Sequence, residues 1–141
     1  MKLALAMASV LEAKVVQPKD AQISDVIESD LVGFGSGIFF GNHEDSLLAL
    51  VDSLPSLDKQ VFIFSTRGRN SLFEKAYHKR LKEKLTQKGC KVMGEYSCRG
   101  FTDYYKIFKI FGGANKGHPT LQEIERAKVF ARELKEKVSA R

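Results

Sequence analysis

The sequence has few cysteines and no long hydrophobic run, and both absences exclude classes of protein. Its 141 residues include only Cys90 and Cys98, which are too few for a disulfide-stapled scaffold. No apolar run approaches the ~18 residues that cross a bilayer. The apolar residues 1–11 are followed at once by Glu12 and Lys14, a poor context for signal-peptide cleavage. We therefore expect a cytoplasmic protein with both thiols reduced, built as one domain over residues 1–141.

Charge is unevenly divided along the chain. Residues 1–60 hold 4 Lys/Arg and 9 Asp/Glu, a net charge of −5, whereas residues 61–141 hold 19 and 8, a net charge of +11; together they give +6. Such asymmetry is found in proteins that bind acidic partners, nucleic acids or membrane surfaces. Here most basic residues fall on two amphipathic helices, where they solvate the outer face. Because no nucleic-acid-binding module is recognisable, we expect neither a nucleic acid nor a membrane as partner.

Helical and strand patterns alternate along the chain. Apolar runs indicate buried strands, and apolar residues at helical spacing indicate amphipathic helices. His78 is expected on the polar side of its helix, and the glycine-rich stretch 98–119 is expected to be a long loop. The predicted strands are 14–17, 31–35, 60–65 and 91–97. The predicted helices are 2–13, a turn at 23–27, 43–54 capped by Asn42, and a helix from the capping box Ser71–Glu74 to Gly89. A last helix from Thr120 has one apolar face, formed by Leu121, Ile124, Ala127, Ala131, Leu134 and Val138.

Continuous apolar strands that alternate with amphipathic helices favour a parallel sheet covered on both faces. Right-handed crossovers then produce an open, doubly wound α/β fold. In such a sheet, ligands bind beyond the carboxyl ends of the strands. The loops expected at this edge contain glycines for close backbone approach, two phenylalanines and two arginines. The candidate binding residues are Ser36, Gly37, Ile38, Phe39, Phe40 and Gly41 in one loop, and Ser65, Thr66, Arg67, Gly68, Arg69 and Asn70 in the other.

The pattern supports no other site chemistry. The three histidines, His43, His78 and His118, lie far apart and lack the spacing of metal ligands. There is no Cys-x-x-Cys motif, no nucleophile elbow, no Walker loop and no Gly-x-Gly-x-x-Gly. We therefore predict no catalytic residue and no metal ligand.

Several segments resemble those of the flavodoxin family. They are Gly-Phe-Gly-Ser-Gly-Ile at 33–38 with Phe-Phe-Gly after it, Phe-Ile-Phe-Ser-Thr at 62–66, Gly-Glu-Tyr-Ser-Cys-Arg-Gly-Phe at 94–101, and Gly-Gly-Ala-Asn-Lys-Gly-His-Pro at 112–119. Together they extend over essentially the whole chain. The resemblance implies a flavodoxin-like sheet with FMN at its carboxyl edge. It further implies that residues 37–41 supply backbone contacts and a stacking aromatic near flavin N5, and that residues 66–70 supply donors to the pyrimidine edge.

The chain departs from the family pattern at its amino-terminal side. Flavodoxins begin with a strand and a phosphate loop of the type Thr-x-Thr-Gly-x-Thr, and this chain begins in the helix that follows. We therefore expect a truncated domain with weak or absent FMN binding, since hydrogen bonds to a charged group contribute about 1.5–3 kcal/mol each. Two functions stay open: an FMN protein that transfers electrons to a redox partner or reduces a small acceptor, and a cofactor-free scaffold or interaction module.

The same departure predicts an open strand edge. In the family's strand order 2-1-3-4-5 the absent strand is the central one, so the strand at 31–35 loses a neighbour. Unpaired strand edges favour association. Either the segment 14–17 moves over to pair with 31–35, or a second copy docks at the gap. We expect the second outcome, a homodimer with residues 1–35 at its interface.

Overall fold

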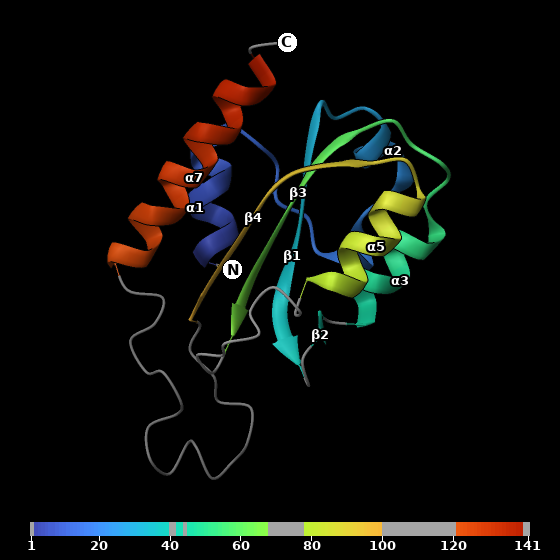
Figure 1. The fold of residues 1–141 in the computed structure, drawn as a ribbon, viewed down its shortest axis with the longest axis horizontal. Helices are drawn as coiled ribbons and strands as arrows, with labels where there is room; N and C mark the ends of the chain where they lie inside the picture. Colours follow the sequence, from blue (N-terminus) through green and yellow to red (C-terminus); the bar gives the residue numbers. More distant parts are fainter. Residues whose placement is uncertain (1, 40–41, 44, 68–77, 100–120, 140–141) are drawn as a thin grey trace, which may run out of the picture.

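The computed structural model describes residues 2–39, 42–43, 45–67, 78–99 and 121–139. Its sheet consists of three parallel strands, β1 (Leu31–Phe39), β3 (Gln60–Arg67) and β4 (Lys91–Arg99), and a short β2 (Asn42–His43) antiparallel to the end of β1. The strand order is β2-β1-β3-β4. Helices lie against both faces of this sheet (Figure 1). The predicted flavodoxin-like α/β fold with parallel strands is therefore confirmed.

All three long strands continue beyond their predicted ends. In β1 the ladder with β3 extends through Ser36, opposite Ser65, and Gly37, opposite Thr66. The apolar pattern ends earlier than the strand because ladder hydrogen bonds join backbone groups and do not require apolar side chains. Part of the glycine-rich segment predicted as a loop is therefore sheet.

The prediction of a strand at 14–17 is wrong. These residues belong to an extended connection from α1 (Lys2–Leu11) to the 3-10 turn η1 (Pro18–Asp20), and in the described part of the chain they pair with no strand. Val15 is 37% exposed there. A short segment that ends at a proline offers few ladder bonds, so its β-propensity does not make it a strand without a partner. The helical turn predicted at 23–27 is present as α2 (Ile23–Ile27).

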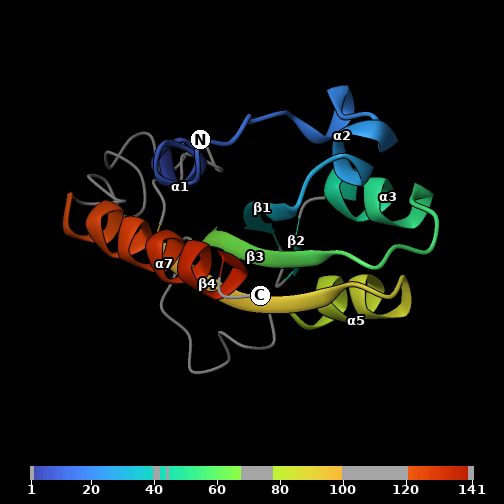
Figure 2. The ribbon, with the colours of Figure 1, turned by 90° about the horizontal axis from the view of Figure 1, so that it is seen from above.

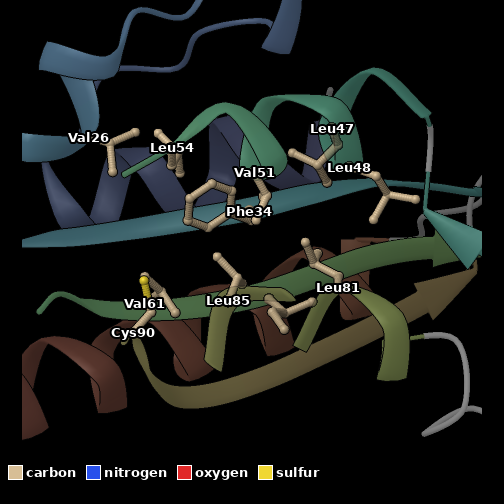
Figure 3. Close-up of a cluster of buried hydrophobic side chains, with 11 residues drawn as sticks. Val26, Phe34, Leu47, Leu48, Val51, Leu54, Val61, Leu81, Leu85 and Cys90 are labelled. Carbon is tan, nitrogen blue, oxygen red and sulfur yellow. The ribbon is translucent and has the colours of Figure 1, made fainter. Parts of the chain in front are cut away.

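The helices form two layers around the sheet (Figure 2). One face packs against α2, α3 (Asp45–Ser53) and α5 (Lys79–Gln87), and the other against α1 and α7 (Leu121–Ser139). The core on the α3/α5 face, drawn in Figure 3, consists of Val26, Phe34, Leu47, Leu48, Val51, Leu54, Val61, Ile63, Leu81, Leu85 and Cys90. The core on the α1/α7 face consists of Leu3, Met7, Phe62, Cys98, Ala127, Ala131 and Leu134.

The ends of two helices differ from their predictions. Asn42 lies in β2 instead of capping a helix, and α3 begins at Asp45, whose carboxylate suits the positive end of the helix dipole. Ala127, Ala131 and Leu134 of α7 are buried as predicted, but Leu121 is 87% exposed because the buried contacts of α7 begin further along the helix. No helix in the described ranges, α7 included, is long and apolar enough to cross a membrane.

Two glycines of β1 make room for aromatic rings of β3. Gly33 lies opposite Phe62 in the ladder, and Gly35 lies opposite Phe64. A Cβ atom on either glycine would come within 3.0 Å of the ring beside it, closer than packed carbon atoms approach. These glycines therefore serve the packing of the sheet against α1 and α7.

The edge of β1 that faces away from β3 is open. Within the described residues, no strand pairs with this edge between Leu31 and Gly37, since β2 pairs only with Ile38 and Phe39. Residues 12–30 connect α1 to β1 on this side of the sheet (Figure 2). They and α1 carry exposed apolar side chains, namely Leu5, Val15, Ile23 and Ile27.

Candidate functional site

Three serines form a row across the sheet near the carboxyl ends of its strands. Ser36 of β1 lies opposite Ser65 of β3, and Ser65 lies opposite Ser97 of β4. Side chains alternate along a strand, so Ser36 and Ser65 follow Phe34 and Ile63 on the face covered by α3 and α5. A polar row therefore replaces the apolar core at this end of the sheet.

His78 is bonded to this row from the start of α5. Its Nε2 lies 2.7 Å from Ser65 Oγ, and its Nδ1 lies 3.1 Å from Glu95 Oε1. Ser65 Oγ is also 2.9 Å from Ser97 Oγ, and Lys82 Nζ lies 3.2 Å from the second oxygen of Glu95. A hydrogen-bonded chain therefore runs from a half-exposed lysine to the fully buried Ser65.

His43 joins the row from β2. Its Nδ1 lies 3.0 Å from Ser36 Oγ, and its ring lies against that of His78 with 5.1 Å between the ring centroids. The side chain is buried, and burial, followed by the charge of His78, lowers the pKa of His43 to about 4. His43 is therefore neutral at physiological pH.

The atoms of Ser65, His78 and Glu95 have the connectivity of a Ser-His-acid triad. Nucleophilic attack needs a hydroxyl that a substrate can reach, and Ser65 is 0% exposed within a strand. Its hydroxyl is therefore placed to orient His78 and not to attack a substrate. No group of three metal-ligating side chains occurs among the described residues. The arrangement is a buried polar layer that fixes two imidazoles near the carboxyl ends of the parallel strands.

The fold brings His43 and His78, which lie far apart in the sequence, into ring contact. The prediction that His78 lies on the polar side of its helix is wrong, because His78 is buried. One pattern in the sequence points to this position. His78 precedes Leu81 by three residues and Leu85 by seven, and both leucines are buried, so all three share one helical face. No local pattern indicates the contact with His43, because the chain between them is long and only the register of the strands joins them.

The predicted binding residues have different positions in the fold. Gly37 lies opposite Thr66 near the carboxyl ends of β1 and β3. Ser36 and Ser65 lie one residue before Gly37 and Thr66, and their hydroxyls are hydrogen bonded to His43 and His78. Only the backbone of Ile38, Phe39 and Arg67 is described, and each is a strand residue at this edge. The predicted site residues Phe40, Gly41, Gly68, Arg69 and Asn70 lie outside the described residues.

Comparison with known proteins finds a relative in an archaeon. No protein-family model matches the sequence. The uncharacterized protein MJ0298 of Methanocaldococcus jannaschii is 42% identical over 134 residues, which span 94% of this chain and 87% of the relative. The chain belongs to the same family as MJ0298. This membership leaves the activity open, because the relative is itself uncharacterized.

Two solved structures share the fold of this family member. A flavodoxin from the domain Archaea superimposes with a TM-score of 0.71 over 98% of this chain and 89% of its own, at 16% identity. The rubredoxin oxygen:oxidoreductase of Desulfovibrio gigas superimposes with a TM-score of 0.70 over 99% of this chain, also at 16% identity. This chain spans 33% of that larger protein. Both comparisons establish the flavodoxin-like fold.

Proposed function

We propose that this protein binds the flavin ring of FMN at the carboxyl edge of β1 and β3 and transfers electrons. The observation that carries the proposal is the superposition of 98% of the chain on an archaeal flavodoxin with a TM-score of 0.71. The segments resembling flavodoxin sequences at 33–38 and 62–66 fall on these two strands. Their ends lie where ligands bind in open parallel sheets.

The described residues at this edge fit a planar ring. Gly37 and Thr66 lie side by side in the last rows of the ladder, where their backbones would flank the ring. Beneath them, the serine row and His78 hold the strand ends in place through buried hydrogen bonds. Nε2 of His43 is a buried polar atom without a partner, as expected beside a ligand that supplies one. When bound, the flavin accepts and releases electrons, and the protein sets how readily it does so.

The ring, more than the phosphate, would supply the affinity. The sequence contains no Thr-x-Thr-Gly-x-Thr segment. Loss of three hydrogen bonds to the phosphate would cost roughly 4–9 kcal/mol, about three to seven decades in affinity. For a chain of these 141 residues, we therefore propose weak FMN binding that differs little from the binding of riboflavin, which lacks the phosphate.

Titration of the purified protein with FMN tests the proposal. A perturbed visible absorbance spectrum and a rise of the unfolding temperature should saturate together, because a ligand that binds only the folded state stabilises it. Riboflavin run in parallel measures the contribution of the phosphate. If neither flavin changes the spectrum or the unfolding temperature at millimolar concentration, the proposed function is wrong.

The charge of the chain suggests how the cofactor would behave. The net charge of +6 favours the anionic reduced flavin and should raise its potential above that of an acidic flavodoxin. The electrons would pass to a redox partner protein or a small acceptor. Cys90 and Cys98 are buried thiols that form no disulfide, which agrees with our proposal of a reducing cytoplasm as the location.

A second candidate function is protein association without a cofactor. The open edge of β1 between Leu31 and Gly37 favours it, because unpaired backbone groups of an edge strand bind other strands. The exposed apolar residues Leu5, Ile23 and Ile27 come from α1 and α2 on this side of the chain. A second copy of the chain is the partner we propose.

A further inference from the structure

Among the buried side chains of the described residues, one polar atom has no hydrogen-bond partner: Nε2 of His43. The side chain is only 3% exposed, so water does not satisfy this atom from the surface. Buried polar atoms without a partner are rare, and each one needs a cause such as a ligand. The other polar groups of the same layer, on Ser36, Ser65 and His78, are hydrogen bonded.

The hydrogen-bond partners of His43 determine which of its two ring nitrogens carries the proton. Ser36 has one hydroxyl proton, which it donates to the carbonyl of Gly37 at 2.7 Å. The Ser36 oxygen therefore accepts from the Nδ1–H of His43, at 3.0 Å. In a neutral imidazole the other nitrogen then carries the lone pair. Nε2 of His43 is thus a fixed acceptor that requires an N–H or O–H donor.

The position of His43 connects this acceptor with the flavin edge. His43 lies in β2, directly opposite Ile38 in the antiparallel pair that ends β1. The ring is held by Ser36 on one side and lies against His78, which Glu95 and Ser65 fix in turn. The acceptor is therefore held in place before any ligand binds.

We propose that Nε2 of His43 accepts a hydrogen bond from the imide N–H of a planar heterocycle bound at the carboxyl edge of β1 and β3. This inference rests on the proposed function, because the pyrimidine ring of a flavin carries such a group at N3. An uncharged donor suits the site, since burial and the neighbouring His78 both disfavour a cation next to His43. A metal ion suits it less, because the described residues supply no group of three ligands.

Two flavins without a phosphate test the proposal. Lumiflavin carries the N3–H, and 3-methyllumiflavin has a methyl group in its place. The wild-type protein should bind lumiflavin roughly three- to tenfold more tightly than 3-methyllumiflavin, which cannot form this one neutral hydrogen bond. His43→Gln places an acceptor near the position of Nε2 and should keep most of this preference. His43→Asn reaches only the position of Nδ1, so it should keep the Ser36 contact and lose the preference.

The outcomes separate this proposal from the proposed function. If the Asn variant keeps the full preference for lumiflavin, the role of His43 is wrong although flavin binding stands. If the wild-type protein binds no flavin, both proposals fail. A readout on the wild-type protein alone covers the case that the variants do not fold. The ¹⁵N resonance of His43 Nε2 should move on addition of lumiflavin and stay in place with 3-methyllumiflavin, and equal responses to the two would overturn the proposal.

Discussion

The imidazole of His43 lies against that of His78, with 5.1 Å between ring centroids, and this contact joins β2 to the start of α5. Both rings are buried. Protonating both imidazoles to the cationic form is unfavourable, because two positive charges in contact repel each other in a buried environment. The pair therefore makes the fold sensitive to acid.

We predict that stability falls as the pH drops from about 6.5 to about 4. Above this window His43 is neutral in the folded and the unfolded state, so it contributes no pH dependence. Within this pH range His43 is protonated in the unfolded state and neutral in the folded state, because burial lowers its pKa to about 4 in the folded protein. Below this pH range His43 is protonated in both the folded and the unfolded state, and the loss in the free energy of unfolding levels off at about 3 kcal/mol.

Urea unfolding between pH 4 and pH 8 measures this loss. His43→Gln removes the titrating group, so the free energy of unfolding of this variant should depend less on pH in the upper part of the window. The lowered pKa of Asp52, caused by its hydrogen bond to Lys84, acts below the window and should be unaffected. Equal slopes for the wild type and the Gln variant would show that His43 is not the group responsible.

Ser65→Ala should destabilise the protein by about 1–3 kcal/mol, because it removes the buried hydrogen bond between Ser65 Oγ and Nε2 of His78. Ser53→Ala is the matched control: its hydroxyl bonds an exposed helix carbonyl, and the change should cost under about 0.5 kcal/mol. Chemical denaturation of both variants gives the comparison. Similar unfolding midpoints for the two would mean that the Ser65–His78 bond contributes nothing to stability.

Gly33→Ala should destabilise the fold by about 1–3 kcal/mol, because the new methyl group would overlap the buried ring of Phe62. Gly94→Ala places its methyl group 3.0 Å from the half-buried ring of Phe130, which can move more easily, and should cost less. Phe62→Leu in the Gly33→Ala background should restore part of the loss. Thermal unfolding of the wild type, the two single glycine variants and the double variant measures these differences. An unfolding temperature of Gly33→Ala equal to that of the wild type would contradict the packing role of this glycine.

Much of the fold was predictable, because the strands and helices are marked by local patterns. The apolar runs at 31–35, 60–65 and 91–97 indicate buried parallel strands, and such strands need helices on both faces. The segment at 14–17 shows the limit of this reasoning, since a strand also requires a partner that β-propensity does not supply.

The candidate site was less predictable, because its contacts depend on register. The sequence marked Ser36 and Ser65 as candidate binding residues but gave no sign of a row with Ser97, which forms only because three strands align the serines. The pairing of His43 with His78 needs that row as its support. The glycine-rich segment was recognisable, but the packing role of Gly33 and Gly35 follows only from the facing rings of β3.

Gly37→Val should weaken FMN binding at least tenfold, because a branched side chain would stand where the backbone must approach the ring. Fluorescence titration of FMN with the variant and the wild type measures the change. Far-UV circular dichroism and the unfolding midpoint serve as controls for the fold. Unchanged FMN affinity in a folded variant would place the ring elsewhere.

The open edge of β1 leads to the last prediction, a homodimer with residues 1–35 at its interface. From Leu31 to Gly37 the strand pairs with β3 on one side and with no described strand on the other. The unpaired backbone groups of an open strand edge bind other strands, so pairing across a two-fold axis would satisfy them and stabilise the dimer. The helices α1 and α2, which carry the exposed Leu5, Ile23 and Ile27, lie on the same side of the sheet's edge strand (Figure 2) and add apolar area there.

Light scattering of the purified chain at micromolar concentration should therefore give the mass of two chains. Ile27→Lys places a charge on the proposed interface and should shift the protein toward the monomer. Val129→Lys is its matched control, since Val129 on α7 is 47% exposed and Ile27 is 45% exposed, and α7 covers the sheet on the side away from α2 (Figure 2). Hydrogen exchange adds a second measurement, because the amides of 31–37 that face the open edge should be protected only at concentrations where the dimer forms. A monomer at micromolar concentration whose edge amides are already protected would show that the chain covers the edge itself, and the dimer would be wrong.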